Sequence, residues 1–253
     1  MRKIAVLLLI LLFSIGYILY RNNEPKTVIA QLQDKKVNFS GNQLHYRVYL
    51  LGLVPAAEAT FEAPVAQDYG GRQVWRLAAH AHSLRWLSFL FKGSSAFHSY
   101  VDTQTLGPVL FKQEIVASGK PEINREAFYD QKNGIMTIAG VKRKIETNTQ
   151  DPLLVIFNLR RMDLNALKTF SFNLNTNQKN YTFKGTVIPA KLFLNHQIHR
   201  IATIRAQIFR KDKNPYHRSR VSAVFLEDQD NIPILIKVFA SGGLITAKLV
   251  DIK

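Results

Sequence analysis

Two pairs of histidines are spaced closely enough to raise the question of a shared metal ion. His80 and His82 are two residues apart in a segment with strand-like alternation, so both side chains are expected on one face. His196 and His199 are three residues apart, a spacing that suits a helix better than the strand or loop expected there. Neither pair has an acidic residue close in sequence, and a catalytic zinc ion needs a third protein ligand. We therefore predict no metal site and no cofactor.

Glu58 and Glu62 are the carboxylates whose spacing invites a test for glycosidase chemistry. On a strand they share one face and lie about 13 Å apart, whereas paired glycosidase carboxylates lie roughly 5–10 Å apart. The chain has no Gly-x-Ser-x-Gly elbow, no Gly-x-Gly-x-x-Gly loop and no phosphate-binding loop motif. It also has no cysteine, which excludes disulfides, thiolate metal sites and cysteine nucleophiles. The sequence therefore offers no catalytic residues, and we predict a protein that is not an enzyme.

Cations dominate the segment 196–220, which holds seven Lys or Arg residues and one acid, Asp212. A turn signal at 213–216 predicts that two strands carry these charges along one hairpin. We expect them to contact an anionic surface; the alternative is a solvated edge whose charges prevent aggregation. The residues are Arg200, Arg205, Arg210, Lys211, Lys213, Arg218 and Arg220.

The charge of the whole chain points to the same class of partner. The formal net charge is +16, and removing residues 1–21 leaves +13 because that segment holds three cations and no acid. An excess of this size favours anionic partners such as anionic lipid headgroups or the phosphates of lipopolysaccharide. We predict no nucleic-acid partner, because an exported chain rarely meets nucleic acid.

The N-terminal segment indicates export. Residues 4–20 are uncharged and follow Arg2 and Lys3, and as a helix they would span about 25 Å, the short end of what crosses a bilayer core. We expect an uncleaved single-pass anchor in the inner membrane, with the C-terminal domain in the periplasm. The alternative is a signal peptide cleaved near residues 14–16, which would release a soluble periplasmic protein. Residues 22–36 are polar and are predicted to be a tether.

Beyond the tether the polarity of the sequence alternates with a period of two, which is typical of β-strands. Leu44, Tyr46 and Val48, for example, alternate with His45 and Arg47. Turn signals at short intervals favour an antiparallel sheet that is strongly curved or closed into a barrel. The expected strands include 72–82, 95–102, 109–117, 122–130, 198–211, 218–227, 232–239 and 244–251.

Two apolar segments depart from this alternation. Asp151 and Pro152 begin a run to residue 162 that is predicted to be a helix, with Asp151 as its N-cap. Because apolar residues cover most of the helix circumference, we expect the sheet to wrap around it. The second segment, 84–91, is expected to pack in the core; the alternative is a rim that touches lipid or an apolar ligand through Trp86, Phe89 and Phe91.

Four patches, in this order along the chain, resemble a known protein family. They are GLVPAAEATFE at 52–62, SYVDTQTLGP at 99–108, QDPLL at 150–154 leading to NLR at 158–160, and IPILIK at 232–237 followed by GLITA at 243–247. Together they resemble the domain-of-unknown-function 3108 family, over residues 40–251. The resemblance implies an exported β-rich domain of Gram-negative bacteria and brings no catalytic residues with it. Ala57 departs from the pattern, because a glycine is expected before the Glu-Ala-Thr run.

These features predict an all-β, mainly antiparallel protein. A strongly curved sheet or barrel wraps around one short apolar helix and is preceded by an N-terminal transmembrane helix. The expected parts are an anchor or signal peptide at 1–21, a tether at 22–36 and a single periplasmic domain at 37–253. The expected function is a carrier-like or adaptor module for envelope lipids or envelope assembly, with an envelope protein complex as a further partner. The alternatives are a hydrolase of envelope polymers and a structural subunit of a membrane complex.

The anchor gives a prediction about the mature protein. If residues 4–20 remain in the membrane, the protein keeps Met1 and stays in the membrane fraction through high-salt and carbonate washes. Mass spectrometry of the N-terminus together with cell fractionation measures both properties. A soluble periplasmic protein that begins at Tyr17 would contradict the anchor and indicate a cleaved signal peptide.

Overall fold

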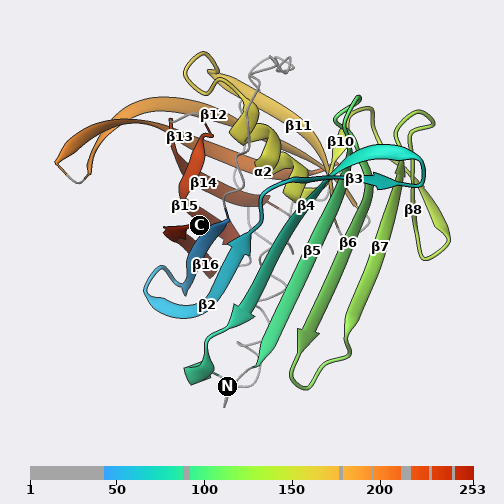
Figure 1. The fold of residues 1–253 in the computed structure, drawn as a ribbon, viewed down its shortest axis with the longest axis horizontal. Coiled ribbons are helices and arrows are strands. Elements are labelled where there is room, and N and C mark those ends of the chain that lie inside the picture. Colours follow the sequence, from blue (N-terminus) through green and yellow to red (C-terminus); the bar gives the residue numbers. More distant parts are fainter. Residues whose placement is uncertain are drawn as a thin grey trace.

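A single sheet of sixteen strands contains most of the residues that the computed structural model describes (Figure 1). The described residues are 43–87, 92–176, 179–194, 196–211, 218–227, 230–240 and 243–253. The strands follow the order β10-β11-β12-β13-β14-β15-β16-β1-β2-β4-β5-β6-β7-β8-β9, and β3 pairs with β4 beside this path. Each of these pairings is antiparallel except that of β10 with β11.

The described residues also form a short 3-10 turn, η1 (Arg85–Leu87), and one α-helix, α2 (Pro152–Arg161). The prediction of an all-β, mainly antiparallel protein with one short apolar helix is confirmed. The eight strand ranges expected from alternation are all present, and the alternation does not predict β3, β8 to β11 or the full length of β12. The strands are β1 (Leu44–Leu50), β2 (Val54–Phe61), β3 (Val65–Tyr69), β4 (Arg72–Ser83), β5 (Gly93–Asp102), β6 (Pro108–Ala117), β7 (Ile123–Asp130), β8 (Ile135–Ile138), β9 (Val141–Lys144), β10 (Thr149–Gln150), β11 (Thr169–Thr176), β12 (Lys179–Leu194), β13 (Gln197–Arg210), β14 (Arg218–Leu226), β15 (Ile232–Ala240) and β16 (Gly243–Ile252).

Several of the predicted features lie outside the described residues. They are the anchor or signal peptide at 1–21, the tether at 22–36, and the side chains of Lys213, Phe89 and Phe91. Within the described part of the chain, no helix is long and apolar enough to cross a membrane.

The helix α2 begins where the sequence predicts it. The Asp151 carboxylate accepts hydrogen bonds from the backbone N–H groups of Leu153 (2.9 Å) and Leu154 (3.0 Å), and Pro152 takes the first helical position. Ser99 on β5 donates a hydrogen bond of 2.5 Å to the other carboxylate oxygen. The cap therefore fixes the N-terminal end of α2 to β5.

A buried asparagine holds the opposite end of α2. The side-chain amide of Asn231 donates hydrogen bonds to the carbonyl oxygens of Arg160 (2.9 Å) and Met162 (2.7 Å). These carbonyls belong to the end of the helix, where backbone acceptors lack partners within the helix. Asn231 directly precedes β15, so the C-terminal end of α2 is tied to a different part of the sheet from its N-terminal end.

The side chains of α2 fill the concave side of the sheet between its two halves. Leu153, Leu154 and Phe157 pack with buried side chains of β4 to β8. Val155 and Leu159 pack with buried side chains of β11 to β14. The helix thus joins two hydrophobic clusters into a continuous interior, which agrees with the expectation that the sheet wraps around it.

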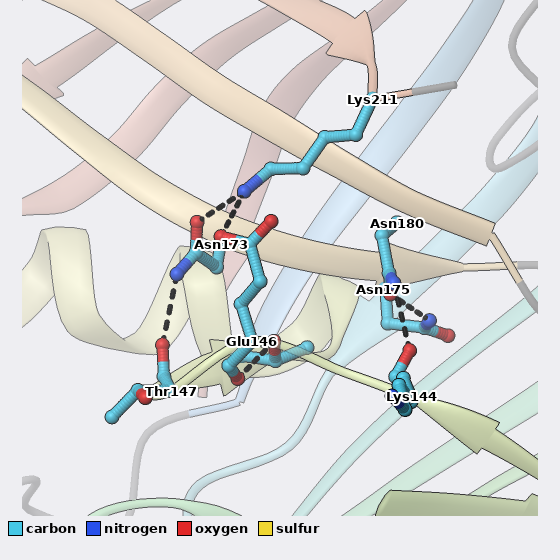
Figure 2. Close-up of polar contacts among 8 residues, drawn as sticks. Lys144, Glu146, Thr147, Asn173, Asn175, Asn180 and Lys211 are labelled. Carbon is cyan, nitrogen blue, oxygen red and sulfur yellow. Dashed lines mark hydrogen bonds and ion pairs between the residues drawn. The ribbon is translucent and has the colours of Figure 1, made fainter. Parts of the chain in front are cut away.

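The two ends of the sheet are linked by side chains, because no strand pairing among the described residues joins β9 to β10 or β11. Figure 2 shows this link, which we call the seam: residues 144–147 lie against β11, β12 and the end of β13. Side-chain amides of Asn180 and Asn173 donate to the carbonyls of Lys144 (2.9 Å) and Thr147 (2.8 Å). The sheet is therefore strongly curved and open, and polar side chains span the gap in its hydrogen-bonded ladder.

The buried helix predicts the effect of introducing a charge. Leu154→Asp or Phe157→Asp should lower the free energy of unfolding by about 3–5 kcal/mol, because each places an unpaired carboxylate in the core. Thermal melting followed by far-UV circular dichroism measures the loss, and Val141→Asp on exposed β9 is the matched control. Unchanged melting of both core variants would place α2 outside the core.

The buried cap predicts a pH dependence of stability. Burial raises the pKa of Asp151 from its ordinary value of 3.8 to about 6, against the opposing effect of the hydrogen bonds it accepts. Because the folded state holds this proton more tightly than the unfolded state, the contribution to stability is complete below pH 3.8 and is lost as the pH rises through 6. Asp151→Asn removes the titration, so its stability relative to the wild type should rise by up to about 3 kcal/mol between pH 4 and pH 7. Urea unfolding at both pH values measures the difference, and parallel profiles would contradict it.

Candidate functional site on the outer face of the sheet

The histidines and glutamates singled out above meet on the outer face of β2 and β4. Antiparallel pairing places Glu58 opposite His82. The His82 Nε2 atom lies 3.4 Å from Glu58 Oε2, and His80 Nε2 lies 3.0 Å from Glu62 Oε1. His80 and His82 therefore have separate carboxylate partners, Glu58 on β2 and Glu62 directly after it. Sequence reasoning does not find these partners, because the β2–β4 register is not local.

Each of these carboxylates is also engaged by an arginine. Arg47 Nη2 lies 2.9 Å from Glu58 Oε1, and Arg76 Nη2 lies 3.2 Å from Glu62 Oε2. His98 packs against His80, and burial, followed by the charges of His80 and Arg76, lowers the pKa of His98. No group of three or more His, Cys, Asp or Glu residues suited to a metal ion occurs among the described residues. This region is a set of ion pairs between neighbouring strands.

The structure separates the seven cations predicted to share one hairpin surface. Arg205 and Arg220 are exposed on the outer face of β13 and β14, where Arg205 lies opposite Ser222. Arg200 is exposed on the other face of β13, Arg210 is half-buried at the end of that strand, and the backbone of Arg218 begins β14. Among those of the seven predicted cations whose side chains are described, only Arg205 and Arg220 are therefore exposed on the outer face.

Lys211 belongs to the seam. Its ammonium group donates a hydrogen bond to Asn173 Oδ1 (2.8 Å) and forms an ion pair with the Glu146 carboxylate (Figure 2). It therefore helps to join the two ends of the sheet. The hairpin prediction missed this role, because Glu146 is 65 residues away in the sequence.

Neighbouring strands add cations that the sequence analysis did not single out. The strand register places Lys237 of β15 opposite Ser222, so Arg205 and Lys237 lie on either side of this serine, about 10 Å apart. Arg220 is two residues from Ser222 on the same face of β14. We define the basic face as the outer-face cations of five consecutive strands: Lys184, Arg205, Arg220, Lys237 and Lys248.

Aromatic rings hold three of these cations in place. Lys184 Nζ lies 4.9 Å from the centroid of the Phe209 ring, and Arg220 Cζ lies 5.4 Å from that of Phe239. Lys248 Nζ lies 4.7 Å from the Tyr49 ring centroid. Cation–π contacts of this kind orient a charge without neutralising it. These three cations therefore keep their charge for a ligand.

Strands β12 to β16 concentrate positive charge. Their only acidic residue is Asp251, close to the C-terminus. The ten cations are Lys179, Lys184, Lys191, Arg200, Arg205, Arg210, Arg218, Arg220, Lys237 and Lys248. The glutamates that form ion pairs with Arg47 and Arg76 lie beyond this region, on the β2 side of the sheet. The arrangement can attract an anionic surface, because these strands carry ten cations and one acid.

The predicted apolar rim is represented by Trp86, which lies in η1 and is 49% exposed. The adjacent Leu84 donates its backbone N–H to the carbonyl of Ala56 (2.9 Å), which brings η1 beside the start of β2. Val54, at the start of β2, is 41% exposed. Trp86 and Val54 are therefore two exposed apolar residues, each two positions along the chain from this hydrogen bond.

A cavity of about 20 Å³ lies between β6 to β8 and β11, lined by Phe111, Ala127, Tyr129, Ile138 and Asn175 among others. This volume is close to that of one water molecule, whereas small-molecule pockets measure roughly 300–1,000 Å³. This cavity is therefore too small for a lipid or a drug-sized ligand.

The fold and this surface define an all-β, barrel-like protein with α2 inside an open, curved sheet and a basic outer face. The family described as "Protein of unknown function (DUF3108)" matches residues 45–250, and the chain belongs to this family. The resemblance found in the four sequence patches is confirmed by this match.

One solved structure has a fold similar to that of this protein. It is the crystal structure of a "Beta-barrel-like Protein of Domain of Unknown Function DUF1849 from Brucella abortus", with a TM-score of 0.61 and 10% sequence identity. The similarity covers 86% of this chain and 98% of that chain. At this identity the likeness concerns the fold alone. No curated protein matches the sequence.

Proposed function

We propose that this protein is a non-enzymatic adaptor of the Gram-negative cell envelope that docks on an anionic surface through its basic face. The observation that carries the proposal is the concentration of ten cations and one acid on β12 to β16. Phosphate-bearing surfaces of the envelope, which are anionic phospholipid headgroups and lipopolysaccharide, match this charge. An envelope protein complex is the further partner that an adaptor requires.

The proposed location is the periplasmic side of the inner membrane. Residues 4–20 serve as a single-pass anchor, and residues 22–36 serve as a tether to the β domain. Cleavage of the N-terminal segment is the alternative, and it would leave a soluble periplasmic protein with the same basic face. The described sheet begins at Leu44, so either form keeps all its strands.

The interior supports an adaptor over a lipid carrier. A carrier must enclose an acyl chain, whereas α2 and the strand side chains occupy the concave side of this sheet. A hydrolase is supported less well, because Glu58 and Glu62 are each engaged by an arginine of another strand. A structural subunit of a membrane complex would also have a filled interior. It would differ from the proposed adaptor in making no contact with lipid.

Sedimentation with vesicles tests the proposal. The chain lacking residues 1–21 should bind vesicles that contain phosphatidylglycerol or lipopolysaccharide, and should not bind phosphatidylcholine vesicles. Binding should weaken with salt, because screening shortens the range of these charges to about 8 Å at physiological ionic strength. Changing Arg205, Arg220, Lys237 and Lys248 to Gln should cost about 4 kcal/mol, close to a thousandfold in affinity, if each charge contributes about 1 kcal/mol.

A charge-matched variant controls for net charge. Lys92, Lys120, Lys132 and Arg143 are exposed cations on other strands and turns, and their change to Gln removes the same charge. This control should bind nearly as well as the unchanged protein. Equal losses in both variants, equal binding to neutral and anionic vesicles, or no binding at all would contradict the proposal and leave the basic hairpin as a solvated edge.

A further inference from the structure

The hairpin of β12 and β13 extends beyond the rest of the sheet. These strands pair with each other as far as Leu194 and Gln197. Strand β11 pairs with β12 only as far as Thr186. Strand β14 pairs with β13 only as far as Ile201. Residues 188–194 and 197–200 therefore form a two-stranded arm, which projects from the body at the left of Figure 1.

Two large apolar side chains are exposed together near the end of the arm. Phe193 and Ile198 are directly opposite each other, and they are 67% and 70% exposed. Ile188, on the other face of β12, is 40% exposed. A two-stranded ribbon is marginally stable in water when nothing covers it. Exposed apolar side chains on such a ribbon mark a contact surface.

Two cations lie opposite each other on the same face of the arm. Lys191 and Arg200 are cross-strand neighbours, both exposed, and lie two residues from the Phe193–Ile198 pair. Neither forms an ion pair within the described residues. The nearest acid along the sheet is Glu227, whose backbone N–H donates to the Arg200 carbonyl (3.0 Å). Like charges directly opposite each other destabilise a ribbon unless an anion lies between them.

The spacing of the two pairs matches a phospholipid surface. Two residues of a strand cover about 7 Å. An anionic phosphate held between Lys191 and Arg200 would therefore leave Phe193 and Ile198 about 7 Å deeper, within the 5–10 Å at which apolar groups meet the boundary of headgroups and acyl chains. This difference in depth is reached when the arm meets the bilayer tip first, with its strands along the bilayer normal.

We infer that the β12–β13 arm inserts Phe193 and Ile198 into the bilayer interface while Lys191 and Arg200 hold a lipid phosphate. The inference goes beyond the basic face, because these four residues lie on the face of β12 and β13 opposite to Lys184 and Arg205, and it rests on the proposed function for the nearby membrane. Described residues begin at Gln43, and a chain of the length between residue 20 and Gln43 reaches at most about 80 Å when extended. An anchored domain would thus remain within reach of the bilayer surface.

A site-specific fluorophore tests the insertion. The sequence has no cysteine, so Gln197→Cys gives a single labelling site at the exposed arm and keeps all four proposed contacts. The full-length protein, labelled with a polarity-sensitive dye, is incorporated into phosphatidylcholine vesicles with or without phosphatidylglycerol. In the anionic vesicles the emission should shift to the blue, and doxyl-labelled lipid should quench it. Val65→Cys, an exposed site on β3, should show neither change.

Variants separate this inference from the proposed function. Phe193→Ser with Ile198→Ser should abolish quenching at position 197, and Lys191→Gln with Arg200→Gln should reduce it. Quenching that survives the basic-face variant would support the arm, because its contact with lipid then does not depend on the basic face. Charge-dependent docking without quenching at 197 would overturn the arm and leave the proposed function standing. A blue shift that doxyl lipid does not quench, or that a soluble glycerophosphate produces alone, would indicate a protein contact or a free-phosphate site and overturn the inference.

Discussion

The buried helix α2 is the constraint on which the shape of the sheet depends. Asp151 and Ser99 tie its first turn to β5, and Asn231 ties its last turn to the segment before β15. Between β5 and β15 the sheet contains β4, β2, β1 and β16. Because a ten-residue helix spans only about 15 Å, these strands must curve around it. The apolar circumference of α2 then contacts both halves of the sheet.

This filled interior has a consequence for function. A sheet that packs one face on a helix leaves the other face to interact with solvent or partners. Along β1 and β2 that face is neutralised by ion pairs such as Arg47 with Glu58. Strands β12 to β16 carry ten cations and one acid, and the longest hairpin exposes Phe193 and Ile198 beyond the body. The cations of the basic face and the exposed apolar pair of the arm thus belong to the same group of strands.

Local sequence patterns predicted many of the strands and the helix, but not which side chains lie next to each other across strands. Alternation located β4 to β7 and β13 to β16, and the Asp151-Pro152 pair located the start of α2, because these signals depend on adjacent residues. The basic face depends on register between strands: Lys237 joins Arg205 only because both pair with Ser222. Lys211 shows the same limit, since its partner Glu146 lies across the seam. No local sequence signal could have assigned Lys237 to the basic face or Lys211 to the seam.

Hydrogen–deuterium exchange of α2 tests most directly the claim that the interior is structural and the outer surface is functional. The full-length protein is measured with and without anionic vesicles, and peptides that cover Pro152–Arg161 are followed by mass spectrometry. We predict that α2 amides exchange only through global unfolding, at a rate that vesicles do not increase. Faster exchange of α2 on vesicles would contradict it, because the helix would then leave the interior and open the sheet to lipid.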